Sequence, residues 1–217
     1  MNRIANKSLK KRILEISKAH NLSHLSSCLT AVDIIKEIYD LKKEDEPFVL
    51  SSGHAGLALY VVLEATGQKT AEAIYAHHGV HPDRCGDCHL DCSSGSLGHG
   101  LGIAVGMALS NPNRNVYCLV SDGEMAEGSI FEALRIAQEA ALQNLKIYVN
   151  VNGWGAYGRI NPAKITSLLR PYEQGLDITV VLTEGTYEDF SFLRGVDGHY
   201  TTLDDDSYKT GMELVVE

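Results

Sequence analysis

The sequence predicts an α/β fold, with a doubly wound, mostly parallel sheet and helices on both of its faces. Four continuous apolar runs, at 48–50, 116–120, 145–151 and 178–182, predict the strands. Runs without polar alternation are typical of parallel strands that are buried on both faces. Stretches with helical spacing of apolar residues separate the runs, and strands that alternate with helices indicate a parallel sheet.

Two helices are expected before the first strand. Ile4, Leu9, Ile13 and Ile16 recur at nearly helical spacing and predict a helix over 2–20. Thr30 is a candidate N-cap for a second helix, because capping residues commonly precede an apolar periodic segment. These helices make up an N-terminal section of residues 1–46.

The central section, residues 47–183, holds the sheet and the expected ligand site. Helices are predicted at 57–65, 71–77, 103–110 and 126–143. The segment 79–102 is rich in Gly, His and Cys and lacks periodicity, and long irregular segments in compact domains are usually functional or disordered. Residues 184–217 are polar and are expected to form a lid-like or partner-facing extension. We expect one domain over 1–217, because this length suits one domain better than two.

Composition excludes several classes of protein. There are 19 Lys and Arg residues against 28 Asp and Glu residues, a formal net charge of −9. This acidic balance argues against non-specific nucleic-acid binding, which needs a basic face. No stretch approaches the 18 or so apolar residues of a membrane span. The N-terminus has no apolar signal-peptide core, so we expect a cytoplasmic protein.

Polar or Gly-rich residues follow three predicted strands, at 51–54, 121–123 and 150–153. In such sheets, ligands bind beyond the carboxyl ends of the strands. Asp122 and Asn152 lie 30 residues apart (152 − 122), about the length of a loop, a crossover helix and a strand. Their carboxylate and amide oxygens are hard ligands suited to Mg²⁺ or Ca²⁺, and they leave positions open for phosphate oxygens.

The residues around these strand ends resemble the N-terminal half of the transketolase family, in which Asp-Gly is followed about 30 residues later by Asn. The resemblance covers nearly the whole chain in order. It implies the thiamine diphosphate-binding fold, with this chain as the diphosphate-binding (PP-type) domain. The matching segments are 50–55, 81–83, 94–100, 104–108, 121–124, 127–128 and 199–200, followed by Asp205, Asp206 and Tyr208.

The resemblance also implies roles for individual residues. Asp122 and Asn152 would bind the metal through their side chains, and Trp154 through its backbone carbonyl. Gly123 would let the main chain approach the diphosphate of thiamine diphosphate. Residues that would contact the cofactor elsewhere are Gly95, Leu97 and His54. The family's active-site histidines match His24, His54, His81 and His199.

The implied activity is transfer of a two-carbon ketol unit from a ketose phosphate to an aldose phosphate. In the family, a glutamate on a second domain activates the cofactor's aminopyrimidine, and this sequence stops at Glu217 before any such domain. We therefore expect activity only with a C-terminal transketolase subunit that carries the pyrimidine-binding domain. The resemblance places Glu127 at the interface and implies a heterotetramer of two copies of each chain.

Two other functions remain open. The segments 121–129 and 150–157 resemble a subgroup of transketolase-like chains with varied substrates, so the acceptor could be another aldehyde in specialised sugar synthesis. Alternatively, the chain could be a non-catalytic regulatory subunit, although the intact metal ligands argue against this.

The five cysteines give two further interpretations. An odd number without a secretory signal favours reduced thiols over a disulfide framework. Cys85, Cys88 and Cys92, with His81 and His89 beside them, allow a zinc interpretation or a metal-binding redox module. The sequence favours free thiols in a Gly-rich loop, because no second CxxC is present.

Overall fold

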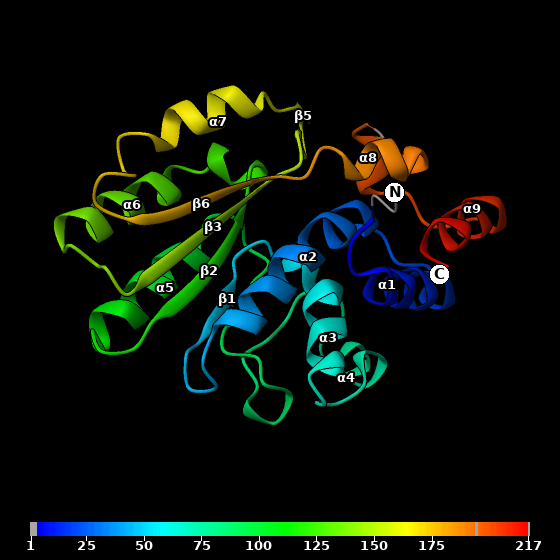
Figure 1. Cartoon of the computed structure of the whole chain (residues 1–217), viewed down its shortest axis with the longest axis horizontal. Coiled ribbons are helices and arrows are strands. Elements are labelled where there is room, and N and C mark those ends of the chain that lie inside the picture. Colours follow the sequence, from blue (N-terminus) through cyan, green and yellow to red (C-terminus); the bar gives the residue numbers. More distant parts are fainter. Residues whose placement is uncertain (1–3, 194, 217) are drawn as a thin grey trace.

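A four-stranded parallel sheet, in the order β1-β2-β3-β6, lies at the centre of the chain (Figure 1). The computed structural model describes residues 4–193 and 195–216. A short antiparallel hairpin, β4 with β5, follows β3. The strands are β1 (Phe48–Leu50), β2 (Val116–Ser121), β3 (Leu145–Val151), β4 (Trp154–Gly155), β5 (Gly158–Arg159) and β6 (Asp177–Leu182).

Helices cover both faces of the sheet, and the predicted fold class is confirmed (Figure 1). Along β2, Tyr117 and Leu119 pack into a core shared with α1 to α4, whereas Val116, Cys118 and Val120 pack into a second core with α5 to α7. Burial on both sides explains the apolar runs of β1, β2 and β3, whereas β6, at the edge of the sheet, is only partly buried. The helices are α1 (Lys7–His20), α2 (Leu25–Leu41), α3 (Gly56–Ala65), α4 (Ala71–His78), α5 (Gly100–Ser110), α6 (Gly128–Glu139), α7 (Pro162–Leu169), α8 (Thr186–Asp189) and α9 (Asp205–Val215).

The register of the sheet brings the three predicted strand ends to one edge. Ser121 pairs with Asn150, and Leu50 pairs with Leu119. The pairing continues past the strands, because Asp122 N donates to Asn150 O at 2.9 Å. Segments distant in the sequence therefore meet at the carboxyl edge, as expected for parallel strands.

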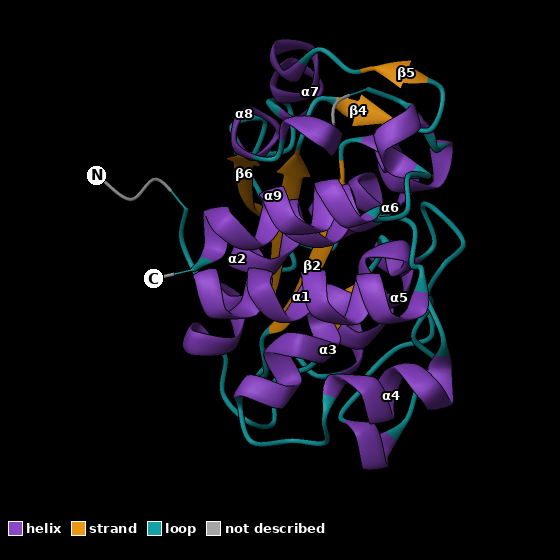
Figure 2. Cartoon of the chain, turned by 90° about the vertical axis from the view of Figure 1, so that its right-hand side faces the viewer, coloured by secondary structure: helices purple, strands orange, loops and turns teal. Residues whose placement is uncertain are grey.

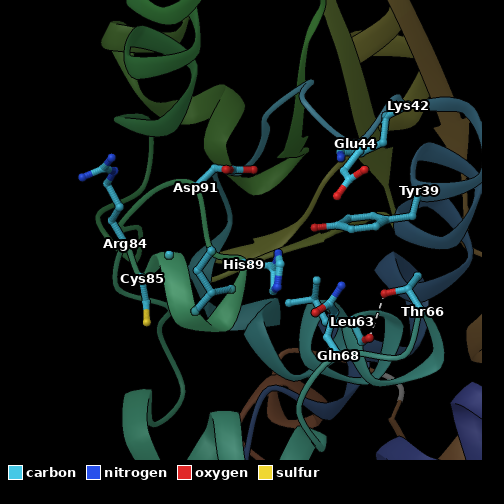
Figure 3. Close-up of a pocket in the computed structure, with 12 residues that line it drawn as sticks. Tyr39, Lys42, Glu44, Leu63, Thr66, Gln68, Arg84, Cys85, His89 and Asp91 are labelled. Atoms are coloured by element: carbon cyan, nitrogen blue, oxygen red, sulfur yellow. Dashed lines mark hydrogen bonds between the residues drawn. The ribbon is translucent and has the colours of Figure 1, made fainter.

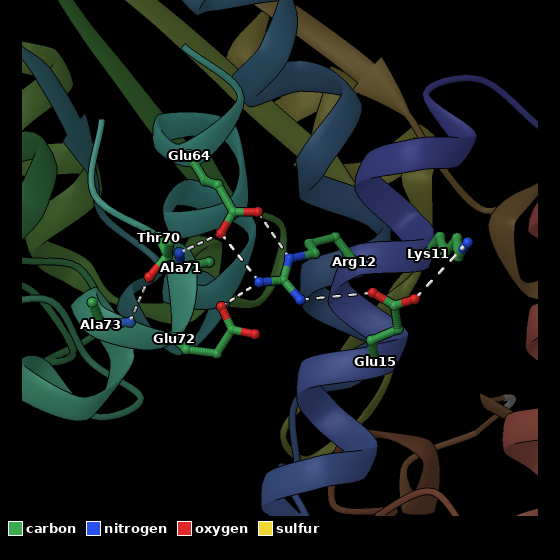
Figure 4. A network of polar contacts seen from close by, with 8 residues as sticks. All are labelled: Lys11, Arg12, Glu15, Glu64, Thr70, Ala71, Glu72 and Ala73. Carbon is green, nitrogen blue, oxygen red and sulfur yellow. Dashed lines mark hydrogen bonds and ion pairs between the residues drawn. The ribbon is translucent and has the colours of Figure 1, made fainter. Parts of the chain in front are cut away.

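Arg12 joins the first helix to the next layer (Figure 4). Its Nε donates to Glu64 Oε1 at 2.8 Å, and its Nη2 contacts Glu72 of α4. Glu64 also accepts from the backbone N–H of Ala71 at 2.6 Å. One guanidinium thus connects α1, the end of α3 and the start of α4.

Helix α2 begins earlier than the sequence predicts, and Thr30 is not its cap. The helix starts at Leu25, and His24 occupies the N-cap position in the left-handed conformation, with φ of 61°. Thr30 lies buried inside the helix, where its Oγ1 donates to Ser27 O and accepts from Asn150 Nδ2 at 3.1 Å. Leu25 and Leu29 belong to the buried apolar face of the helix. Because they are buried, the helix begins before Thr30, whose capping preference is weaker than this packing.

Other helices also differ from the prediction, and α1 starts at Lys7 instead of residue 2. Helix α6 ends at Glu139 instead of 143, and Ala141 takes a positive φ of 51°. Helix α7 was not predicted, although its start carries recognisable signals. Asn161 Oδ1 caps Ala163 N at 3.0 Å, and Pro162 occupies the first turn.

The C-terminal residues fold back onto the N-terminal helices, whereas the sequence suggests a polar, lid-like extension. Helix α9 lies alongside α1 (Figure 2), and a Cβ added at Gly211 would lie 3.2 Å from Leu14. Phe190, Leu193 and Val215 are buried in the same core as α1. The polar residues lie on the outer side of this packing, which is why composition suggested an exposed segment.

Candidate functional site

A cavity of about 200 Å³ opens at the carboxyl edge of the sheet. Except for Asp122 and Glu127, every predicted site residue lines it. Asp122 lies between two lining residues, Ser121 and Gly123, and is 1% exposed. The predicted residues that line the cavity are His24, His54, His81, Gly95, Leu97, Gly123, Asn152, Trp154 and His199, and they are joined by Ser27, Ser52, Ser121, Asn150 and Tyr200.

A larger cavity, of about 430 Å³, lies at the other end of the sheet (Figure 3). Tyr39, His89 and Asp91 line it, and Asp91 Oδ2 accepts from Phe48 N at 2.9 Å, at the start of β1. Ligand sites in parallel sheets lie at the opposite, carboxyl ends. We therefore regard the smaller cavity as the candidate functional site.

Backbone N–H groups from two separate turns donate hydrogen bonds to the Asp122 carboxylate. Its Oδ1 accepts from Gly123 N at 3.0 Å, and its Oδ2 accepts from Gly153 N at 2.7 Å. Asn152 Oδ1 accepts from Trp154 N at 2.9 Å. Each of these oxygens keeps a lone pair beyond its backbone bond. The turn needs glycine at 153, because its φ is 84° and a Cβ there would lie 2.8 Å from Glu184.

This environment fits a divalent cation. Burial raises the pKa of Asp122 to about 7, against the opposing effect of the backbone N–H groups. A bound cation would reverse that effect, because a nearby opposite charge favours the ionised carboxylate. Asp122, Asn152 and the half-buried Trp154 main chain could hold Mg²⁺ or Ca²⁺ and leave positions for phosphate oxygens.

Three of the predicted histidines form one cluster. The ring of His24 lies 4.5 Å from that of His199 and 5.3 Å from that of His54, measured between centroids. His24 Nδ1 and His199 Nε2 are 3.0 Å apart, a hydrogen bond that requires one donor and one acceptor nitrogen. The His24 backbone N–H also donates to His199 O at 2.9 Å. The folded-back C-terminal region therefore completes this cluster.

Burial keeps these imidazoles neutral. Burial and then the neighbouring histidines lower the pKa of His24 to about 4 and that of His54 to about 3. Burial also lowers the pKa of His199. His81 comes from the loop after α4, and its ring packs 2.9 Å from the position of a Cβ added at Gly95.

This cluster predicts loss of stability in acid. A histidine whose folded pKa lies below its unfolded value near 6.5 contributes stability above pH 6.5, which is lost as pH falls towards the folded pKa. Between pH 6.5 and 5 the loss should be about 1–2 kcal/mol for each group, allowing for partial exposure. Urea unfolding should show a weaker acid dependence for His54→Asn than for the unchanged chain. His20→Asn, at an exposed position of α1, should leave the dependence unchanged; an equal effect of both variants would contradict the assignment.

Glu124 is a site residue whose burial and role the sequence left open. It is fully buried, and one oxygen accepts from Ser51 Oγ at 2.6 Å and from Gly98 N at 2.9 Å. The other accepts from Ser121 N at 3.0 Å. Glu124 thus connects the end of β1, the loop before α5 and the end of β2. An Asp-Gly-Glu run after a strand gives no sign of these long-range partners.

Glu127 lies outside the cavity, half-buried at the N-cap position of α6. Its Cβ lies 2.7 Å from the position of a Cβ added at Gly98, a residue with φ of 81°. Gly98 is therefore required for this close approach. The interface role of Glu127 stays a prediction.

The fold and the cavity define an α/β domain with a polar ligand site at the carboxyl edge of its sheet. Residues 39–185 match the family model described as "Transketolase, thiamine diphosphate binding domain". The chain belongs to the transketolase family. Human transketolase is 30% identical over 181 residues, and human transketolase-like protein 2 is 32% identical over 182 residues.

Each of these two alignments covers 74% of this chain but only 29% and 27% of the relative. The chain therefore spans less than a third of their length. Among solved structures, transketolase from Leishmania mexicana superposes with a TM-score of 0.64 at 17% identity, over 99% of this chain and 45% of the other. That structural likeness supports the fold. No helix within residues 4–193 and 195–216 is long and apolar enough to cross a membrane.

Proposed function

We propose that this chain is the diphosphate- and metal-binding half of a transketolase that transfers a two-carbon ketol unit from a ketose phosphate to an aldose phosphate. The observation that carries the proposal is that buried Asp122 adjoins, along the chain, a cavity lined by Asn152, Trp154 and a histidine cluster. We treat residues 1–217 as one domain. Its sections are the N-terminal helices 1–46, the sheet and site 47–183, and the C-terminal region 184–217.

The protein's own groups have distinct tasks in this proposal. Asp122, Asn152 and the Trp154 carbonyl would hold the cation, and Gly123 would allow close approach of the diphosphate. A Cβ at Gly123 would lie 3.6 Å from Gly155, so the protein alone does not require glycine there. Thiamine diphosphate, when bound, supplies the nucleophilic carbon for breaking and forming carbon–carbon bonds next to a carbonyl.

The histidines would act on the sugar. With lowered pKa values, His24 and His54 are neutral near pH 7, so each can donate one hydrogen bond and accept another. Such groups can orient hydroxyls and stabilise a developing alkoxide, an effect worth roughly 3–4 kcal/mol for one donor. Gly95 and Leu97 would contact the cofactor's rings, as the resemblance implies. His81, at the mouth of the cavity, and His199 would complete the sugar site.

We further propose a C-terminal partner subunit with the pyrimidine-binding domain, in a cytoplasmic heterotetramer of two copies of each chain. Support comes from the match of residues 39–185 to the thiamine diphosphate binding domain of transketolases, which the resemblance pairs with a pyrimidine-binding domain. Glu127, at the start of α6, would face the partner. Mg²⁺ is the preferred cation, because few protein ligands with phosphate oxygens are typical of magnesium sites.

Calorimetry tests the proposal directly. Thiamine diphosphate with Mg²⁺ should bind tightly when the partner subunit is present and weakly to this chain alone. The assembled pair should convert xylulose 5-phosphate and ribose 5-phosphate. If the pair binds cofactor but converts neither sugar, the alternative with another aldehyde acceptor is supported. If Asp122→Ala leaves activity of the assembled complex unchanged, the regulatory-subunit alternative is supported and the catalytic proposal fails.

A further inference from the structure

A second cluster of metal-binding side chains lies outside the cavity, where α4 ends. Nitrogen atoms of His77 and His78 and the sulfur of Cys85 all lie within 4.8 Å of one another. The two imidazole rings are 4.5 Å apart and nearly perpendicular. A tetrahedral zinc site holds nitrogen and sulfur ligands roughly 3.3–3.8 Å apart, as follows from its bond lengths. Small side-chain rotations would bring these three atoms to that spacing.

Cys88 offers a second sulfur near this cluster, outside the group of three ligand atoms that lie within 4.8 Å of one another. The short 3₁₀ helix Gly86–Cys88 follows Cys85, and an isolated bridge pairs Cys85 with Leu90. This tight turn places the two thiols near each other. Lys69 Nζ lies 3.8 Å from Cys88 Sγ, where it can offset thiolate charge. Both cysteines are free thiols.

An independent observation points to a missing ligand. His78 Nε2 is buried and has no hydrogen-bond partner among the described residues. Buried polar atoms are nearly always partnered, and an orphan of this kind indicates an absent water or ion. A neutral imidazole nitrogen is a typical zinc donor, and His78 lies in the same group as the Cys85 thiol.

The other residues considered from the sequence do not share this place. The Cys85 sulfur points away from the His89 ring (Figure 3). Cys92 is buried in the core on the opposite face of the sheet and contacts Ser93 O. His81 faces the cofactor cavity. The structure therefore replaces the ligand set suggested by sequence proximity with one that includes two histidines from α4.

We propose that His77, His78, Cys85 and Cys88 bind one structural Zn²⁺ ion. Two imidazoles and two thiolates satisfy tetrahedral zinc and leave no open position, which is the arrangement of structural sites. Binding releases the two thiol protons, and the paired thiolates balance the charge of the ion.

The ion would brace the loop that carries His81. Residues 79–84, which include His81, lie between the proposed ligands His78 and Cys85. The role of His81 rests on the proposed function, but metal binding itself does not. Zinc analysis without thiamine diphosphate therefore tests this inference separately.

The test uses the full chain, purified under reducing conditions. We expect one zinc per chain by elemental analysis, and Co²⁺ substitution should give tetrahedral ligand-field bands with thiolate-to-cobalt charge transfer. Cys85→Ser and His78→Gln should weaken Co²⁺ binding on the order of a hundredfold, since loss of outer-shell partners alone costs 10–100-fold. Cys88→Ser should remove about half of the charge-transfer intensity, because thiolates are its source.

His89→Asn is the matched control, because it removes an exposed histidine of the same loop and asparagine tolerates the left-handed backbone there. It should leave Co²⁺ affinity unchanged. The inference is overturned if reduced unchanged protein neither retains zinc nor shows the cobalt spectrum. It is equally overturned if Cys85→Ser and His78→Gln bind Co²⁺ as the unchanged chain does, or if Cys92→Ser alone removes binding.

Discussion

Replacing Asp122 with asparagine should abolish metal-dependent thiamine diphosphate binding while leaving the folded chain about as stable as before. The amide keeps one acceptor oxygen, so one of the two backbone bonds from Gly123 and Gly153 is lost, at a cost of about 1 kcal/mol. The variant no longer buries a carboxylate that is 1% exposed, which offsets this cost. Cofactor affinity of the assembled complex should fall at least about a hundredfold, or about 2.7 kcal/mol.

Urea unfolding with EDTA, and then with Mg²⁺ and thiamine diphosphate, separates the two effects. A ligand that binds only the folded state stabilises it in proportion to the logarithm of its concentration over Kd. In the assembled complex, the unchanged chain should gain stability from the cofactor, and the Asp122→Asn chain should gain almost none. Asp177→Asn is the control, because this exposed carboxylate lies at the opposite end of β6, beside Lys146. Full stabilisation of Asp122→Asn by the cofactor would show that Asp122 is not a metal ligand.

The sheet and the edge that carries the site could be predicted because both depend on short-range patterns. Each strand consists mostly of apolar residues, and parallel pairing places every carboxyl end on one edge. Asp122 and Asn152 follow directly from that geometry. The cavity contains the predicted histidines because they come from segments that end at this edge or pack against it.

What the sequence did not predict depends on contacts between distant segments. The start of α2 was placed at Thr30 because a threonine before apolar residues is typical of a cap, but burial of Leu25 extends the helix. The C-terminal residues looked like an exposed extension, because a polar composition does not reveal that Phe190 and Val215 are buried against α1. The side chains of His77, His78 and Cys85 likewise come together because the loop after α4 folds back, and their spacing in the sequence does not reveal this.

Glu124→Ala should produce the largest loss of stability of any single change in the site, about 3–5 kcal/mol in urea unfolding. The alanine removes a buried carboxylate that accepts from Ser51 Oγ, Gly98 N and Ser121 N, three donors in three segments. Each buried donor left without an acceptor costs about 1–3 kcal/mol. Because Gly98 and Ser51 flank the cavity, the variant should also loosen the loop that carries Gly95 and Leu97.

Two comparisons identify the cause of that loss. Glu124→Gln keeps the shape and one acceptor oxygen, so it should lose less stability than the alanine variant, about 1–3 kcal/mol. Glu132→Ala, on the exposed side of α6, should change stability by less than about 0.5 kcal/mol. If Glu124→Ala behaves like Glu132→Ala, the buried hydrogen bonds do not hold the three segments together, and the order of the cavity must come from apolar packing of α5 and α6 against β2. If the predicted ranking holds, Glu124, two residues after the proposed metal ligand Asp122, fixes the edge of the sheet that carries the site.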